Sequence, residues 1–160
     1  MEISELEVEI EDVEWFAIDS EGEIAHFTSG AYGLLPKSVT QSRENLDVIT
    51  DFFSTELQVT TLGEIDDKAF SMVNLRSDSP EIRQIVFEES LEMASKGLYS
   101  YDSYDAVANS EIYFRVSLPN VPLRIDSLPP HIRRVIEVTS LKNTVFKRDR
   151  IINKETILNP

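Results

Sequence analysis

The sequence predicts an α+β fold: one domain over residues 1–160, with a central, largely antiparallel sheet, an early β-hairpin and two to three helices. A chain of 160 residues suits a single hydrophobic core. Strand patterns come first, helical patterns follow and strand patterns return, which is typical of α+β proteins rather than of alternating α/β ones. The hairpin supplies the third indication, because it is apolar on both faces.

This hairpin is the element around which the remaining chain is predicted to pack. Two apolar runs, Trp15–Ile18 and Ile24–Phe27, flank the segment Asp19–Gly22. A type I turn closed by a glycine with positive φ suits that segment as a four-residue connection. Successive residues of the first run point to opposite faces and all are apolar, so we expect the hairpin at the centre of the sheet.

The two ends of the chain are predicted to lie outside this core. Residues 1–10 alternate acidic and aliphatic side chains with a period of two, which favours a half-solvated strand. We expect an acidic edge strand here, with a disordered acidic arm as the alternative. Residues 153–160 are expected to form a loose tail.

Three helices are expected from their capping signals. Ser38–Gln41 has the pattern of a capping box, and the helix should continue to about Thr55. A second helix begins with Ser79 as its N-cap and ends at Gly97. A short helix is expected over His131–Val138. The buried faces are predicted to contain Val39, Leu46, Ile49 and Phe53; then Ile82, Ile85, Val86, Met93 and Ala94; then Ile132, Val135 and Ile136.

Further strands are expected where β-branched and aromatic residues gather. Ile112–Leu118, Lys68–Leu75 and Thr144–Ile152 are predicted strands, and Gln58–Asp67 is a short strand or a loop.

Charge is the strongest signal in the composition. The formal net charge is −14, and residues 1–80 hold 18 acidic and 4 basic side chains whereas residues 81–160 hold 11 of each. Such a negative field disfavours nucleic-acid binding and favours a basic protein partner. Solubility alone is the alternative reason for this charge.

Composition also indicates a cellular setting. The absence of cysteine excludes disulfides and thiolate chemistry, which suits the cytoplasm. The first residues lack the basic and apolar regions of a signal peptide, and no apolar run reaches the roughly 20 residues of a membrane span. We expect a soluble cytoplasmic protein.

Motifs for catalysis or metal binding are not evident. Neither Gly-x-Ser-x-Gly nor Ser-x-x-Lys occurs, and the two histidines, His26 and His131, are interpreted as structural or surface residues. Asp19-x-Glu21-Gly22 resembles the start of a calcium loop but lacks its remaining ligands, so it is interpreted as a turn. We predict no catalytic residue, no metal and no cofactor, although carboxylate catalysis stays open.

An aromatic and acidic surface is the remaining candidate for function. Tyrosines are enriched at binding hot spots, and those of this chain alternate with serine and aspartate near residue 100. A tyrosine-rich strand that covers the core is the alternative. The predicted protein-binding residues are Glu7, Glu9, Glu11, Asp12, Tyr32, Tyr99, Tyr101, Asp102, Tyr104 and Asp105.

Four segments together carry a resemblance to known proteins. Glu14–Ser29, Gly33–Pro36, Lys96–Asp102 and Pro122–Pro129 resemble small uncharacterised bacterial proteins, some related to immunity proteins of polymorphic toxin systems. The resemblance implies a non-enzymatic binding function and transfers no catalytic residue.

The leading hypothesis is therefore an acidic protein-binding domain, in its specific form an immunity protein that neutralises a basic toxin. A small-ligand or enzymatic domain with a pocket near Trp15, His26 and Tyr32 is the second hypothesis. A structural subunit of an assembly is the third.

Overall fold

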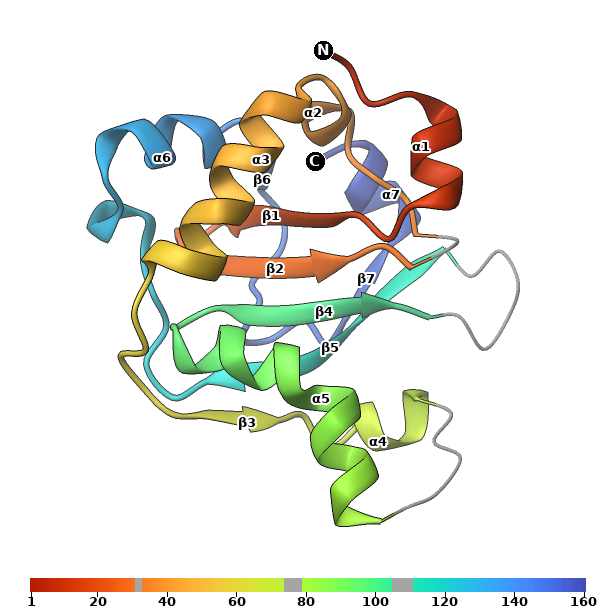
Figure 1. Ribbon diagram of the computed structural model, residues 1–160, viewed down its shortest axis with the longest axis vertical. Coiled ribbons are helices and arrows are strands. Elements are labelled where there is room, and N and C mark those ends of the chain that lie inside the picture. Colours follow the sequence, from red (N-terminus) through yellow and green to blue (C-terminus); the bar gives the residue numbers. More distant parts are fainter. Residues whose placement is uncertain (31–32, 74–78, 105–110) are drawn as a thin grey trace.

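The computed structural model describes residues 1–30, 33–73, 79–104 and 111–160, which build one mixed sheet with helices packed on it (Figure 1). The strand order is β3–β5–β4–β2–β1–β6, and β7 pairs with β5 outside this path. Pairing is antiparallel except for β2–β4 and β1–β6, so the predicted α+β fold with a largely antiparallel sheet is confirmed. The strands are β1 (Glu14–Asp19), β2 (Ile24–Thr28), β3 (Gly63–Ile65), β4 (Tyr99–Ser103), β5 (Ile112–Pro119), β6 (Ser140–Leu141) and β7 (Ile151–Asn153).

The helices lie mainly between strands β2 and β4 and after β5. The described helical elements are α1 (Glu5–Ile10), α2 (Lys37–Thr40), α3 (Arg43–Asp51), the π-helical turn η1 (Phe52–Glu56), α4 (Ala69–Met72), α5 (Pro80–Ser95), the 3-10 turn η2 (Ile125–Ser127), α6 (Pro130–Ile136) and α7 (Lys154–Leu158). None of these helices is both long and apolar enough to cross a membrane.

The hairpin occupies the centre of the sheet, as predicted, and Gly22 has φ of +79°. Its connection is one residue shorter than expected, because the Asp19 amide donates to the Glu23 carbonyl (3.0 Å). Asp19 Oδ1 also accepts from the amides of Glu21 and Glu23 (2.9 Å each), which fixes the turn. Ile18 consequently pairs with Ile24, and Phe16 pairs with His26.

The two faces of the sheet have different cover. On one face Phe16 stacks on Phe53 (centroids 4.6 Å apart), and Figure 1 shows α3 and α5 in front of this side. On the other face Trp15 stacks on Phe27 (3.9 Å), and Phe27 meets Phe146 from the C-terminal segment behind the sheet. Alternate residues of each central strand therefore enter separate parts of the core.

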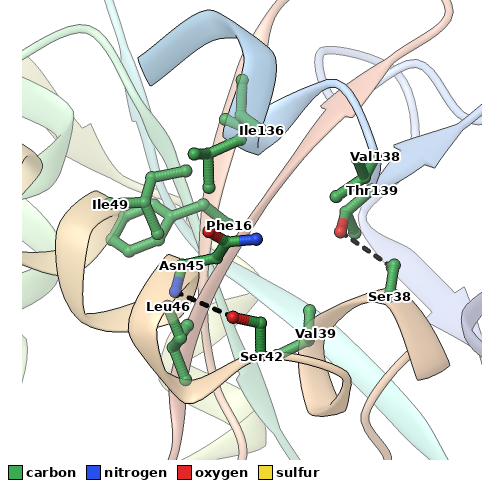
Figure 2. Close-up of a pocket in the computed structure, with 11 residues that line it drawn as sticks. Phe16, Ser38, Val39, Ser42, Asn45, Leu46, Ile49, Ile136, Val138 and Thr139 are labelled. Atoms are coloured by element: carbon green, nitrogen blue, oxygen red, sulfur yellow. Dashed lines mark hydrogen bonds between the residues drawn. The ribbon is translucent and has the colours of Figure 1, made fainter. Parts of the chain in front are cut away.

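The packing of α3 and α6 on β1 leaves almost no space. Figure 2 shows Phe16, Leu46 and Ile49 facing Ile136 around a cavity of about 20 Å³. At its edge the Ser38 and Thr139 hydroxyls are 2.8 Å apart and share a hydrogen bond. A space of this size holds about one water molecule, not a metabolite.

The predicted acidic edge strand within residues 1–10 is wrong, because this segment contains the helix α1. Ser4 accepts from the Glu7 amide while the Glu7 carboxylate accepts from the Ser4 amide, which completes a capping box. Ile3 is buried, and its amide donates to the Thr40 carbonyl (2.8 Å). The alternative of a disordered arm is also not what the structure has.

The predicted loose tail, residues 153–160, is likewise corrected. Asn153 caps α7 by accepting from the Thr156 amide (3.1 Å), and Ile157 is buried in the core. Of the strand predicted over Thr144–Ile152, only the end forms β7. Residues Lys68–Leu75, predicted as a strand, contain the short helix α4 instead.

The long helix predicted from Ser38 to Thr55 is divided into α2, α3 and η1, because Ser42 begins a new helix by capping the Asn45 amide. The four predicted buried residues of this region, Val39, Leu46, Ile49 and Phe53, are all buried.

Helix α5 starts and ends as predicted, with Ser79 as N-cap and Gly97 at φ of +95° beyond its end. Its buried face is different. Ile85 and Val86 are exposed, and Phe87 takes the expected place in the core. The helix α6 lies within the predicted range and buries Ile132 and Ile136.

Candidate functional site

An acidic hollow forms where the segment between α1 and β1 passes α3. We use this name for an open space of about 410 Å³. It is lined by Glu11, Asp12, Val13, Glu14, Arg43, Leu46, Asp47, Thr50, Asp51 and Ser54. Five carboxylates and one guanidinium group thus share one surface depression, although they come from two segments about 30 residues apart.

Local structure explains how α3 contributes to the hollow. Ser42 caps the helix, which begins at Arg43, and residues Asp47 and Asp51 lie one turn apart on the same side. Leu46 and Ile49 are buried and hold the opposite side of α3 against the sheet. The two aspartates are therefore left exposed at the edge of the hollow.

Ion pairs and hydrogen bonds fix the other wall. Arg43 donates to Glu7 (3.2 Å) and to Glu11 (3.0 Å), which ties α3 to α1. The Gly30 amide donates to Asp12 (2.7 Å), which holds this carboxylate beside β2. Within the described residues, Asp12, Asp47 and Asp51 have no cationic side chain within ion-pair distance.

A second cluster adjoins the hollow at Glu14. Glu14 on β1, His26 on β2 and Glu89 on α5 each offer one ligand atom, and these atoms lie within 4.8 Å of one another. Phe16 pairs with His26 in the hairpin, so Glu14 is diagonal to His26 on the same face of the sheet. Helix α5 covers that face and brings Glu89 over both residues. We call this trio the Glu–His–Glu cluster.

His26 is completely buried, and its two ring nitrogens differ in their surroundings. Nδ1 is 3.0 Å from Ser100 Oγ, whereas Nε2 has no hydrogen-bond partner among the described residues. Burial lowers the pKa of His26 to about 4, and the negative charges of Glu89 and Asp12 oppose this change. The imidazole is therefore neutral near pH 7.

Glu14 has the opposite change in pKa. A side-chain hydrogen bond with Glu89, followed by burial and by repulsion from Glu89 and Asp12, raises the pKa of Glu14 to about 8. Two carboxyl groups at this separation favour one shared proton over two negative charges. The cluster thus concentrates carboxylate oxygens and an imidazole lone pair at one point.

The structure places the predicted protein-binding residues in three different settings. Glu9, Glu11 and Asp12 are exposed, and Glu7 is half-buried beside Arg43, so these four lie at or near the acidic hollow. Asp102 is half-buried and accepts from the Thr28 hydroxyl (2.8 Å) on the sheet. The predicted contacts Tyr32 and Asp105 lie outside the described residues.

Two of the predicted contact tyrosines are corrected. Tyr99 and Tyr101 are 1% and 0% exposed, because β4 lies inside the sheet and both rings enter the core beside Phe146. The Tyr101 hydroxyl donates to the carbonyls of Phe146 and Asp149. The tyrosine-rich strand thus covers the core, which was the alternative interpretation. Tyr104 is half-buried against Phe114.

The pocket predicted near Trp15, His26 and Tyr32 is also corrected. Trp15 pairs with Phe27 and His26 pairs with Phe16, so the two side chains lie on opposite faces of the hairpin. Both residues are completely buried. They cannot line a common cavity through the sheet.

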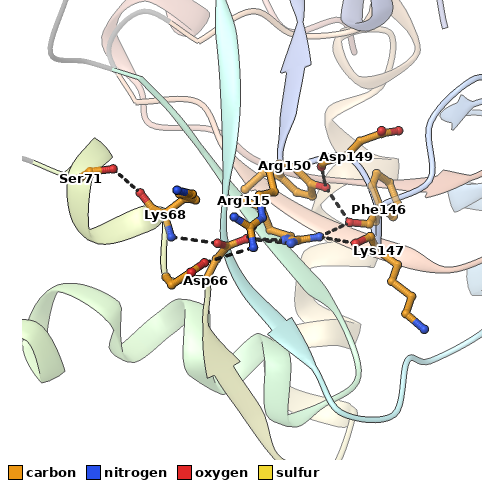
Figure 3. Close-up of polar contacts among 10 residues, drawn as sticks. Asp66, Lys68, Ser71, Arg115, Phe146, Lys147, Asp149 and Arg150 are labelled. Atoms are coloured by element: carbon orange, nitrogen blue, oxygen red, sulfur yellow. Dashed lines mark hydrogen bonds and ion pairs between the residues drawn. The ribbon is translucent and has the colours of Figure 1, made fainter.

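A third polar cluster lies at the opposite part of the sheet and has a structural role. Figure 3 shows Arg115 beside Asp66, with Nε and Nη2 each 2.8 Å from Oδ2. Arg115 also donates to the carbonyls of Phe146 (2.6 Å) and Lys147 (2.8 Å). This buried ion pair is fully hydrogen-bonded and ties β3 and β5 to the C-terminal segment.

Sequence reasoning missed the Glu–His–Glu cluster. His26 was noted and interpreted as structural, whereas Glu14 and Glu89 were not selected. The polar residues Glu14 and His26 in an otherwise apolar hairpin were the available signal. The position of Glu89 could not be found, since it depends on how α5 docks.

Comparison with known proteins adds no relative. No protein-family model, curated protein or solved structure matches this chain. The resemblance to immunity proteins therefore stays a prediction.

Proposed function

We propose that this chain is a non-enzymatic protein-binding domain whose acidic hollow receives a basic segment of a partner protein. The observation that carries the proposal is the gathering of five carboxylates from two chain segments around one depression. Arg43, the single basic residue in its lining, is already paired with Glu7 and Glu11. The hollow therefore has more acceptors for positive charge than its own lining provides.

The shape of the hollow suits long cationic side chains. It is open to solvent and has an apolar floor, to which Val13 and Leu46 contribute. The methylene stems of lysine or arginine can pack on such a floor while their charged ends reach the carboxylates. Arginine is the better fit, because its planar guanidinium forms paired hydrogen bonds with a carboxylate.

The distribution of charge supports the same partner class. The net charge of −14 arises within residues 1–80, which include α1 and α3 beside the hollow. A one-signed field accelerates encounter with a basic protein and repels phosphate backbones. Salt bridges at the rim then add specificity more than affinity.

In its specific form, the proposal is a cytoplasmic immunity protein that neutralises a basic toxin. The resemblance of four chain segments to such proteins motivates this form, and the acidic hollow is compatible with it. Occupying the basic active site of a toxin would require only binding, so no catalytic step is assigned to this chain.

The experiment compares proteins captured from a lysate of the source cells. The baits are the wild type, an Asp47→Asn/Asp51→Asn variant in the hollow and a Glu64→Gln/Glu81→Gln variant. Each variant removes two exposed carboxylates, but Glu64 and Glu81 do not line the hollow. We expect a basic protein that the wild type and the Glu64/Glu81 variant retain and the Asp47/Asp51 variant loses. Equal capture by all three baits, or capture of acidic proteins only, would contradict the proposal.

A further inference from the structure

The Glu–His–Glu cluster has the composition of a divalent metal site. We propose that Glu14, His26 and Glu89 together bind one divalent transition-metal ion, with Zn²⁺ as the best fit. This inference does not rest on the acidic hollow as a binding surface, because His26 and Glu89 are outside its lining.

The buried imidazole is the first observation in favour. Nε2 of His26 has no hydrogen-bond partner among the described residues, although the residue is completely buried. Native proteins leave few buried polar atoms unsatisfied, and each one points to a missing partner. A metal ion bound at Nε2 would supply that partner.

The surroundings of the second ring nitrogen fit this role. Ser100 Oγ lies 3.0 Å from Nδ1, and the Ser100 hydroxyl in turn donates to Ser90 Oγ (3.4 Å). Because the Ser100 proton is directed to Ser90, we infer that Nδ1–H donates to Ser100. The Nε2 lone pair is then free for a metal ion, and the hydrogen bond at Nδ1 fixes the ring, as is usual for ligating histidines.

The two carboxylates are placed to complete the set. Their oxygens and one imidazole nitrogen lie within 4.8 Å of one another. Zn²⁺ forms bonds of about 2.0–2.2 Å to nitrogen and carboxylate oxygen, which keeps any two ligand atoms within about 4.4 Å. Glu89 is exposed on α5, so a change in its side-chain rotamer can close the remaining distance.

The chemistry of the ligands decides the class of metal. One imidazole and two carboxylates suit Zn²⁺ and neighbouring transition ions, whereas Mg²⁺ and Ca²⁺ prefer oxygen ligands alone. Asp12 adds negative charge close to the cluster but is held by the Gly30 amide, so it is not assigned as a ligand. Three protein ligands leave one position of a tetrahedral ion accessible to solvent or to a partner group.

Metal binding is tested on the full chain after treatment with a chelator. Isothermal titration with Zn²⁺ measures affinity, and Co²⁺ absorption reports coordination by nitrogen and oxygen. We expect one site per chain, with Zn²⁺ and Co²⁺ bound at least tenfold more tightly than Mg²⁺ or Ca²⁺.

The decisive comparison is between two neighbouring glutamates of α5. Glu89→Gln should weaken Zn²⁺ binding about tenfold or more, whereas Glu88→Gln, which changes an exposed residue outside the cluster, should leave it unchanged. Glu14→Gln should act like Glu89→Gln. His26→Gln should abolish the Co²⁺ spectrum if it folds; the two glutamate variants decide the question if it does not.

Absence of saturable Zn²⁺ and Co²⁺ binding would overturn the proposal and leave a proton shared by Glu14 and Glu89 as the occupant of the cluster. Equal Zn²⁺ affinities of the Glu89→Gln and Glu88→Gln variants would overturn it as well, by assigning the ion to other surface carboxylates. Neither result would bear on partner capture, for which the Asp47→Asn/Asp51→Asn variant is the test.

Discussion

Glu14 and His26 lie diagonally across the β1–β2 hairpin on one face of the sheet, because His26 pairs with Phe16 rather than with Glu14. This register places a half-buried carboxyl group beside a completely buried imidazole, at the point where α5 brings Glu89 over the sheet. Two strands and one helix therefore combine into a polar cluster inside an otherwise apolar layer. The cluster adjoins the acidic hollow through Glu14, which belongs to both.

The first prediction concerns the pH dependence of stability in the presence of a chelator. The pKa of Glu14 is raised to about 8 from an ordinary 4.5, so the folded state binds more protons than the unfolded state between these values. Its contribution to stability is therefore lost as the pH rises towards 8. His26 has the opposite effect, since its lowered pKa of about 4 makes stability increase between pH 4 and 6.5.

Only Glu14 of this pair changes its contribution between pH 6.5 and 8, and we expect the free energy of unfolding to decrease in that interval. Urea denaturation at both pH values measures the decrease. Glu89→Gln should reduce it, because the variant removes the neighbouring charge, and Glu88→Gln should retain it. An identical pH dependence in all three proteins would contradict this assignment.

The second prediction concerns the buried ion pair of Figure 3. Asp66→Asn leaves the Arg115 guanidinium buried without a countercharge, and we expect the free energy of unfolding to fall by about 3–5 kcal/mol. Arg150→Gln is the matched control. Arg150 also contacts Asp66 (3.5 Å) but is largely exposed, so its loss should cost less than about 1 kcal/mol. Similar costs for the two variants would show that Arg115 is not held as described.

The third prediction concerns the tyrosines of β4. Tyr101→Phe leaves two backbone carbonyls without their donor and should lower stability by about 1–3 kcal/mol. Partner capture should be unchanged, since the ring is completely buried. Tyr104→Phe, at a half-buried position, should change stability by less than about 0.5 kcal/mol. Loss of capture with unchanged stability in Tyr101→Phe would restore the surface interpretation.

Local signals in the sequence were sufficient where the structure is decided locally. The start of α5 was predicted from Ser79 followed by Pro80, and its end from Gly97, because capping and positive φ depend on a few adjacent residues. The central hairpin followed from two apolar runs. The buried face of α5 did not follow, since Ile85 and Phe87 are both apolar and only docking decides which one is covered.

Competing local patterns explain the error at the N-terminus. Alternating glutamates and aliphatic residues indicated a strand, but Ser4 and Glu7 also form a capping box, and packing of Ile3 favours the helix. The candidate site failed for a different reason. A hairpin connection one residue longer would have shifted the partner of His26, and Glu89 is 63 residues away from His26 in the chain. Neither register nor helix docking can be read from adjacent residues.

The exposed acids were predicted more successfully than the tyrosines. Glu9, Glu11 and Asp12 carry charge that is costly to bury, so their position at the surface follows from their chemistry. A tyrosine is stable in either setting provided that its hydroxyl has a partner, as the hydroxyl of Tyr99 has in Glu23 (2.8 Å). The sequence could not distinguish these settings.

The most direct test of the acidic hollow is the association rate of the captured basic partner, measured at several salt concentrations. For the wild type and for Glu64→Gln/Glu81→Gln, we expect a rate that falls steeply with salt. Asp47→Asn/Asp51→Asn should associate more slowly at low salt, should depend less on salt and should dissociate faster. Equal rates and equal salt dependence for both double variants would contradict the claim that this hollow receives the partner.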